Sequence, residues 1–128
     1  MKKLLFAFAI AGLALVSSAF AGAYPDISLP DLKAAIAAGK VTLIDVNGTE
    51  SYVAGHIPGA IDFEANETRL ATLLPADKNA LIVAYCANEG CNAYKLGAAA
   101  AHKLGYANVK HFPLGIEGWK KAGEPVAK

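Results

Sequence analysis

The chain alternates between short apolar runs and segments with helical spacing, and turn residues separate the two kinds. Four runs are short, rich in apolar residues and bounded by Gly, Asn, Asp or Pro, which is typical of buried strands. They cover residues 41–46, 60–63, 80–85 and 109–112. Helical spacing covers residues 29–38, 50–53, 67–74, 92–104 and 116–122. Because the two kinds alternate with short connections, the pattern predicts an α/β fold with a parallel sheet that helices cover on both faces.

Two helices have boundaries that the sequence marks clearly. The first is predicted to begin after Ser28, a suitable N-cap, to carry Pro30 in its first turn and to end at Gly39. The helix over residues 92–104 is rich in Ala and Gly, which allows a close approach to a sheet. Its inward face is predicted to consist of Leu96, Ala99, Ala100 and Leu104.

Residues 1–21 have the pattern of a cleaved secretory signal peptide. Lys2 and Lys3 precede an apolar run over residues 4–16, and small residues follow up to Ala-Phe-Ala at 19–21. A retained membrane anchor is the alternative, but the apolar run is shorter than the roughly 20 residues that a spanning helix needs. We therefore expect a periplasmic or secreted protein whose mature part, residues 22–128, forms one domain and does not bind the membrane after cleavage.

The mature chain is close to neutral. The full sequence has 12 basic and 11 acidic residues, and removal of Lys2 and Lys3 leaves 10 basic residues, so the net charge of the mature chain is −1 with His neutral. This balance argues against nucleic acid and anionic membranes as partners. The 3 His and 2 Cys residues lack the paired spacing of a zinc site, so we expect neither a metal nor a cofactor. We expect a monomer or a weak homodimer.

Both cysteines lie where the most apolar strand passes into the longest helix. Cys86 directly follows the strand over residues 80–85, and Cys91 directly precedes the helix over residues 92–104. Unpaired backbone N–H groups and the positive end of a helix dipole meet at such a junction, so a group placed there is favoured as an anion. Ligands of open parallel sheets also lie beyond the carboxyl ends of the strands. Cys86 is therefore the candidate reactive residue.

Five short motifs occur in order along the chain. They are LIDV at 43–46, GHIPGA at 55–60, YC at 85–86, LGYANV at 104–109 and GIEGWKKAGEPV at 115–126. Together they resemble the single-domain rhodaneses, a family of sulfurtransferases. The resemblance implies a five-stranded parallel sheet flanked by helices and a catalytic cysteine, here Cys86, that opens a six-residue loop. In this family the cysteine carries a persulfide between a sulfur donor and a thiophilic acceptor.

The loop after Cys86 differs from related loops in its charged residues. The residues predicted to bind substrate are Ala87, Asn88, Glu89, Gly90, Cys91 and Asn92. An Arg in the place of Asn92 would hold a phosphate dianion in the related phosphatases, so phosphoryl chemistry is disfavoured. Asn47 likewise stands where many members have Arg. Because the loop lacks Arg and carries Glu89, we expect a preference for persulfide donors over thiosulfate.

We expect the pKa of the Cys86 thiol to be lower than that of a free cysteine. Inward-pointing N–H groups stabilise the thiolate by about 1.5–3 kcal/mol each and the helix terminus by about 0.3–1 kcal/mol, whereas the exposed Glu89 costs only about 1 kcal/mol. A thiolate needs no general base. The sequence therefore predicts a cycle in which Cys86 takes a sulfane sulfur from thiosulfate, polysulfide or a persulfide and passes it to a thiol or cyanide.

The role of Cys91 is open at the level of sequence. It could be a small structural residue, a thiol that resolves the Cys86 persulfide, or a disulfide partner that locks the site. Two functions stand beside sulfur transfer: a catalytically silent binding module, and a thiol–disulfide redox protein that uses Cys86 and Cys91. The silent module would typically lack the loop cysteine, and the redox protein would typically have a C-x-x-C spacing.

Several other polar and aromatic residues are predicted to be structural. The set comprises Asp45 as an acceptor that holds a loop, His56 as a ring that fixes a turn, Tyr85 and Trp119 as core or pocket wall, and His102 and His111 as surface residues.

Overall fold

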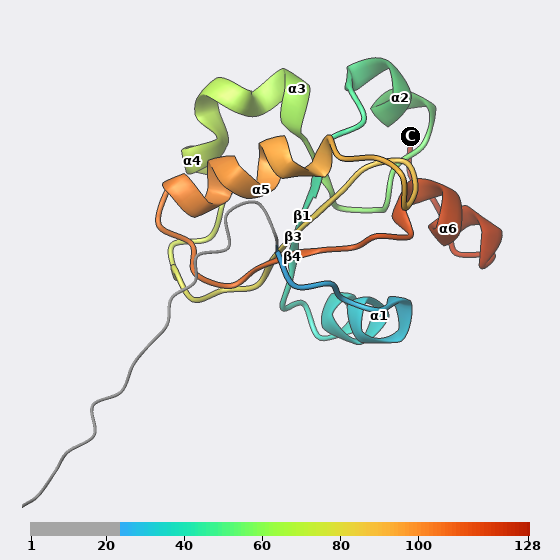
Figure 1. Ribbon diagram of the computed structural model, residues 1–128, viewed down its shortest axis with the longest axis horizontal. Helices are drawn as coiled ribbons and strands as arrows, with labels where there is room; N and C mark the ends of the chain where they lie inside the picture. The colour runs from blue at the N-terminus through green and yellow to red at the C-terminus, as the bar shows by residue number, and fades with distance from the viewer. Residues whose placement is uncertain (1–23) are drawn as a thin grey trace, which may run out of the picture.

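A sheet of four parallel strands forms the centre of the computed structural model, which describes residues 24–128 of the chain. Figure 1 shows the helices arranged around it. The strands are β1 (Thr42–Asp45), β2 (Ile61–Asp62), β3 (Ile82–Tyr85) and β4 (Val109–His111), in the spatial order β2-β1-β3-β4. Ile44 on β1 pairs with Ala84 on β3 and with Ile61 on β2, and Ala84 pairs in turn with His111. The predicted parallel α/β fold is confirmed. The predicted signal peptide, residues 1–21, lies outside the described residues.

The sheet has four strands, whereas the resemblance implied five. Residues 25–27 lie along β4, where the Ile27 N–H donates to His111 O and the His111 N–H donates to Pro25 O, both at 2.8 Å. This pairing amounts to a single β-bridge between Asp26 and His111. It is short because Pro25 has no N–H to donate and because the chain enters a helix at Leu29.

Helices cover both faces of the sheet, as Figure 1 shows. The face that carries Val83 and Tyr85 packs against α1 (Leu29–Ala37) and α6 (Gly115–Lys121). The opposite face packs against α3 (Phe63–Asn66), α4 (Leu70–Leu73) and α5 (Tyr94–Lys103). The short α2 (Thr49–Ala54) follows β1. The N-cap prediction for α1 is confirmed, since Ser28 Oγ accepts the Asp31 N–H at 3.2 Å.

The inward face of α5 is shifted by one or two positions from the predicted one. Leu96 was expected to face the sheet, but it is 63% exposed. The buried residues of the helix are Tyr94, Gly97, Ala98 and Ala101. The reason is the close approach at Gly97, where a Cβ atom would lie 2.9 Å from the Cγ2 atoms of both Ile44 and Val46. The smallest residues therefore face the sheet, and the larger Leu96 lies on the outside.

The helical segment predicted over residues 67–74 begins earlier and is divided into three pieces. It starts with α3 at Phe63, passes through a 3₁₀ turn at Glu67–Arg69 and ends with α4. The early start follows from Asp62, whose Oδ1 accepts the Ala65 N–H at 3.4 Å and so caps α3.

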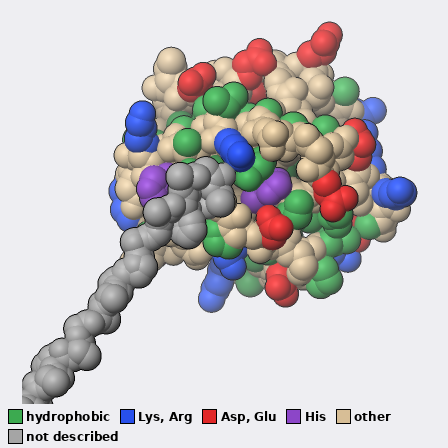
Figure 2. Space-filling model, viewed as in Figure 1, with side chains coloured by type: hydrophobic (Ala, Val, Ile, Leu, Met, Phe, Trp, Pro, Cys, Tyr) green, Lys and Arg blue, Asp and Glu red, His purple; other side chains and the backbone are tan. Residues whose placement is uncertain are grey.

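Charged side chains of both signs are interspersed on the face that Figure 2 shows, which agrees with the nearly neutral composition. Within residues 24–128, no helix combines the length and the apolar composition that crossing a membrane requires.

Candidate active site

Cys86 lies directly beyond the carboxyl end of β3, a central strand of the sheet. β3 pairs with β1 on one side and with β4 on the other, and all four of its residues are buried. The Cys86 side chain is 1% exposed and belongs to the core on the α5 side. The candidate nucleophile thus lies at the sheet edge where ligands of parallel sheets bind.

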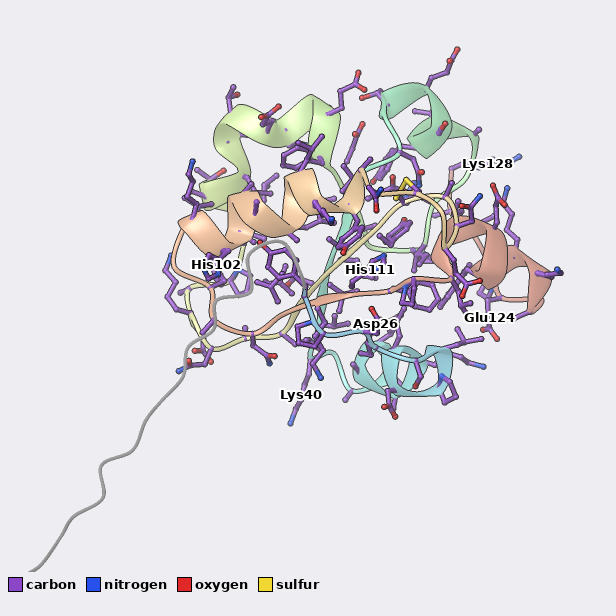
Figure 3. The ribbon with its side chains drawn as sticks, viewed as in Figure 1. Asp26, Lys40, His102, His111, Glu124 and Lys128 are labelled. Carbon is purple, nitrogen blue, oxygen red and sulfur yellow. A yellow bond between two sulfur atoms is a disulfide. The ribbon has the colours of Figure 1, made fainter. Side chains whose placement is uncertain are left out.

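A disulfide joins Cys86 to Cys91 and closes the predicted substrate loop, as the yellow bond in Figure 3 shows. The Cα atoms of the two residues are 6.2 Å apart. Ala87 and Cys91 are half-buried, and Asn88, Glu89, Gly90 and Asn92 are exposed. The structure therefore gathers all the predicted site residues in one loop between β3 and α5. Among the roles that the sequence left open for Cys91, the structure shows Cys91 as the disulfide partner of Cys86.

Asn88 organises the interior of this loop. Its Oδ1 accepts the Gly90 N–H at 2.9 Å, and its backbone carbonyl accepts the Cys91 N–H at 3.1 Å. Two of the amide groups that were expected to point at the Cys86 sulfur are thus bonded to Asn88 in this disulfide-linked form. A lowered pKa of the reduced Cys86 thiol stays a prediction.

The first turn of α6 forms hydrogen bonds with the backbone of the first two loop residues, Cys86 and Ala87. The Ile116 N–H donates to Cys86 O and the Glu117 N–H donates to Ala87 O, both at 3.0 Å. This contact requires Gly115, which has a φ of +63° and would place a Cβ atom 2.5 Å from Cys86 O. The free N–H groups of one helix therefore fix the backbone of the reactive residue.

Two carboxylates, of Glu89 and Glu117, lie beside the loop, and the N-terminus of α5 follows it in the chain. Glu89 is exposed, and Glu117 Oε1 accepts the Asn88 side-chain N–H at 3.2 Å. The N-cap residue of α5 is Ala93, whose side chain cannot cap, and the first turn carries Lys95. The first turn of α5, which begins three residues beyond Cys91, has no acidic residue, so the helix dipole favours negative charge at the loop.

A buried hydrogen-bond chain anchors β3 immediately before Cys86. The Tyr85 hydroxyl donates to Asp45 Oδ2 at 2.6 Å and accepts the Ile57 N–H at 3.0 Å. Asp45 Oδ1 accepts the Asn47 N–H at 2.8 Å. Asp45 is fully buried and acts as a loop-holding acceptor, as predicted. Burial raises the pKa of Asp45 above 3.8, although the hydrogen bonds from Tyr85 and Asn47 lower it, and burial beside Asp45 raises the pKa of Tyr85.

The Tyr85→Phe substitution is expected to destabilise the protein by about 1–3 kcal/mol near neutral pH, because it leaves the Asp45 carboxylate and the Ile57 N–H without their partner. Since the pKa of Asp45 is raised from 3.8, its carboxylate opposes folding above that pH, and losing the Tyr85 donor increases this effect. The loss of stability should therefore be smaller at acid pH, where Asp45 is protonated. Denaturant unfolding of the variant and the parent at two pH values measures this.

The matched control is Tyr52→Phe, which removes a half-buried hydroxyl that donates to Ala60 O at 2.7 Å. It should cost about 1 kcal/mol or less, with no comparable pH dependence. Equal losses for Tyr85→Phe at both pH values would contradict the role given to Asp45.

His111 was predicted at the surface, but it is 7% exposed. Its ring stacks on Tyr94 with a centroid distance of 3.4 Å, its Nδ1 lies 3.4 Å from Asp26 Oδ1, and Figure 3 shows it beneath the start of α5. Its Nε2 has no hydrogen-bond partner among residues 24–128. Burial lowers the pKa of His111, while Asp26 raises it. The sequence contained an indication that His111 is buried, because residues 109 and 111 of one strand face the same side and Val109 is apolar.

His56 has the structural role that was predicted for it. Its Nδ1 lies 2.8 Å from Tyr52 O, and its ring stacks on Tyr52 with a centroid distance of 3.6 Å. Tyr85 and Trp119 are buried in the core, as predicted, and His102 is exposed.

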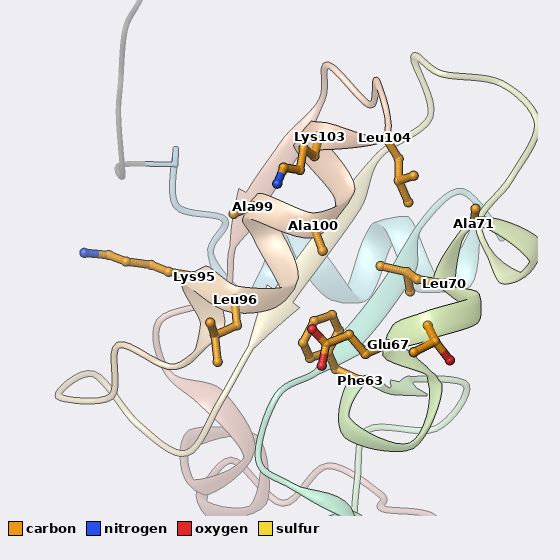
Figure 4. Close-up of a pocket in the computed structure, with 11 residues that line it drawn as sticks. Phe63, Glu67, Leu70, Ala71, Lys95, Leu96, Ala99, Ala100, Lys103 and Leu104 are labelled. Atoms are coloured by element: carbon orange, nitrogen blue, oxygen red, sulfur yellow. The ribbon is translucent and has the colours of Figure 1, made fainter.

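A groove of about 570 Å³ runs between α5 and the α3–α4 segment, and neither cysteine lines it (Figure 4). Phe63, Leu70, Leu96 and Ala100 line it, and the Lys95 side chain points away from it. The groove therefore does not form part of the candidate site. Within residues 24–128, no three His, Cys, Asp or Glu side chains gather as metal ligands would.

Comparison with known proteins agrees with this geometry. The family model of the rhodanese-like domain matches residues 28–122. The chain belongs to the rhodanese-like family. The catalytic cysteine that the resemblance assigned to Cys86 thus lies within the rhodanese-like domain, after its central strand β3.

Two relatives and one solved structure are similar to this chain. The chain is 43% identical over 91 residues to an HTH-type transcriptional regulator of Mycobacterium tuberculosis, a match that covers 70% of the chain and 38% of the regulator. It is 31% identical over 108 residues to the human thiosulfate:glutathione sulfurtransferase, which covers 74% of the chain and 92% of that protein. The crystal structure of a thiosulfate sulfurtransferase from Pseudomonas aeruginosa superposes with a TM-score of 0.64 at 21% identity, over 81% of this chain and 20% of that one.

Proposed function

We propose that this protein is a sulfurtransferase that carries sulfane sulfur as a persulfide on Cys86. The observation that carries the proposal is the position of Cys86, buried beyond the end of a central strand in a loop backed by two helix N-termini. A relative that matches 74% of this chain over 92% of its own length is a sulfurtransferase by name, which supports the same chemistry. The match to a transcriptional regulator covers only 38% of that protein, so the role of that protein carries no argument for this chain.

The catalytic cycle begins with the reduced form of the loop. The Cys86 thiolate attacks the outer sulfur of the donor, the donor thiolate leaves, and Cys86 becomes a persulfide. An acceptor thiol or cyanide then attacks the outer sulfur and releases the Cys86 thiolate. The dipole of α5 stabilises the anion at both stages, because the helix begins three residues beyond Cys91 and has no acidic residue in its first turn.

The donor class follows from the charges of the loop. Glu89 is exposed on it and Glu117 is bonded to Asn88 beside it, so a dianion such as thiosulfate would approach two carboxylates. Asn92 supplies no positive charge. We assign persulfides of small thiols, or polysulfide, as the preferred donors, and small thiols as acceptors. The signal-peptide pattern of residues 1–21 supports a periplasmic or secreted location for this reaction.

The donor assignment is tested by comparing turnover of thiosulfate and of a small-thiol persulfide, and persulfide is expected to be the better substrate. The Glu89→Gln variant should raise kcat/KM for thiosulfate about two- to fivefold at low salt and change that for the persulfide less, because it removes one exposed like charge. Glu50→Gln, an exposed carboxylate on α2, is the matched control and should change neither. A clear preference of the parent protein for thiosulfate would refute the assignment.

A further inference from the structure

Cys86 and Cys91 are the 2 cysteines of the chain, and they are bonded to each other. Their Cα atoms are 6.2 Å apart, within the range of about 4.4–6.8 Å that disulfides usually occupy. The loop conformation that surrounds Cys86 therefore already brings the Cys91 sulfur to the Cys86 sulfur. A sulfur held on Cys86 would have a second thiol as its neighbour.

Asn88 keeps Cys91 in this place. Its carbonyl accepts the Cys91 N–H at 3.1 Å, its Oδ1 accepts the Gly90 N–H at 2.9 Å, and its Nδ2 donates to Glu117 Oε1 at 3.2 Å. These bonds link both ends of the loop to α6, which also holds the Cys86 carbonyl. They do not involve either sulfur atom, so they can persist when the disulfide is reduced.

Access to the two sulfurs is unequal. Cys86 is 1% exposed, whereas Cys91 is half-buried and lies between the exposed Gly90 and Asn92. An acceptor from solution must enter the loop to reach Cys86, but Cys91 needs no entry. A thiol tethered by a short loop acts at an effective concentration on the order of millimolar or more, so it competes well with acceptors in solution.

We propose that Cys91 is a resolving thiol that attacks the Cys86 persulfide and releases hydrosulfide, so that the domain reduces sulfane sulfur to sulfide. This activity rests on the proposed function, because it requires sulfur to be loaded onto Cys86 first. It gives Cys91 a catalytic role in which the disulfide of this structure is the product of one turnover.

The step balances without an added oxidant. The Cys91 thiolate attacks Cys86 Sγ, the inner sulfur of the persulfide, the Cys86–Cys91 bond forms, and the outer sulfur leaves as hydrosulfide. The persulfide sulfur is reduced, and the two cysteine sulfurs are oxidised to the disulfide. A thiol or dithiol reductant from solution then attacks the more accessible Cys91 sulfur and expels the Cys86 thiolate. A second thiol releases Cys91 from the mixed disulfide and completes the cycle.

The test uses the whole mature protein. The protein is first reduced, and the reductant is then removed under anaerobic conditions. It is mixed with a small excess of glutathione persulfide, and released hydrosulfide and the alkylated mass of the protein are measured. The parent protein should release one hydrosulfide per chain and end with both cysteines protected from alkylation. Cys91→Ser should hold one extra sulfur on Cys86 and release hydrosulfide at least about tenfold more slowly. Cys86→Ser, which also has a single cysteine, should show only the background of the donor.

Two results would overturn the proposal in distinguishable ways. If the parent protein keeps a stable persulfide while Cys91 stays open to alkylation, Cys91 does not resolve it, and the proposed sulfur transfer stands. If Cys91→Ser gains no sulfur, or gains the whole donor thiol as a mixed disulfide, then Cys86 does not accept sulfane sulfur and the proposed function fails as well.

Discussion

Replacing Cys86 by Ser is expected to lower sulfur transfer from a persulfide donor by roughly three orders of magnitude or more, because the hydroxyl of Ser cannot hold a sulfane sulfur and the nucleophile is lost. In this variant the half-buried Cys91 is the remaining thiol, and it does not lie at the end of β3, where Cys86 lies. Steady-state transfer to glutathione, measured on reduced protein, reports the loss.

The control for this prediction is Cys91→Ser, which loses the same disulfide. By the chain-entropy argument, closing so short a loop contributes about 2 kcal/mol to stability, and both variants forfeit this relative to the oxidised protein. They should therefore unfold at similar denaturant concentrations. Only Cys91→Ser should still take up sulfur. If Cys86→Ser kept substantial transfer activity, the reaction would not pass through Cys86.

The Gly115→Ala substitution is expected to destabilise the protein by about 3 kcal/mol or more and to lower sulfur transfer about tenfold or more. A left-handed conformation costs Ala about 1–2 kcal/mol, and the new Cβ atom would also lie 2.5 Å from Cys86 O and 2.6 Å from Ala87 O. Relief of this overlap must move either α6 or the backbone of the reactive loop. Thermal unfolding and persulfide turnover measure the two effects.

Gly39→Ala is the matched control for the energetic cost of placing Ala in a left-handed backbone conformation. Gly39 has a φ of +68°, similar to the +63° of Gly115, but a Cβ atom there would meet nothing within 4 Å. The control should lose only about 1–2 kcal/mol and should leave sulfur transfer unchanged. If the two variants were equally stable and equally active, the contact between α6 and the Cys86 loop would not matter.

The strands and the place of the reactive residue could be predicted because both follow from local pattern. Buried parallel strands are short apolar runs, and a residue just after β3 has to lie at the sheet edge where ligands bind. The cap at Ser28 was predictable for the same reason, since a hydroxyl and the N–H three residues on suffice to define it. These features depend on residues that are neighbours in sequence.

The features that sequence reasoning missed depend on contacts between distant segments. The inward face of α5 is set by Ile44 and Val46 across from Gly97, and no spacing within the helix reveals which neighbour comes closest. The alternation with Val109 indicated that His111 faces inward, but its stacking on Tyr94 and its cover by residues 25–27 come from distant segments. The use of the Gly90 and Cys91 amides by Asn88 depends on the exact fold of a loop that has no periodic pattern.

The central claim is that Cys86 accepts a sulfane sulfur, and the intact mass of the Cys91→Ser variant tests it most directly. The variant is reduced, freed of reductant, exposed briefly to a small-thiol persulfide and analysed whole and as alkylated peptides. The account predicts a gain of one sulfur atom, carried by the peptide that contains Cys86 and removed by a thiol acceptor. An unchanged mass would contradict it and would identify a domain that binds without transferring sulfur.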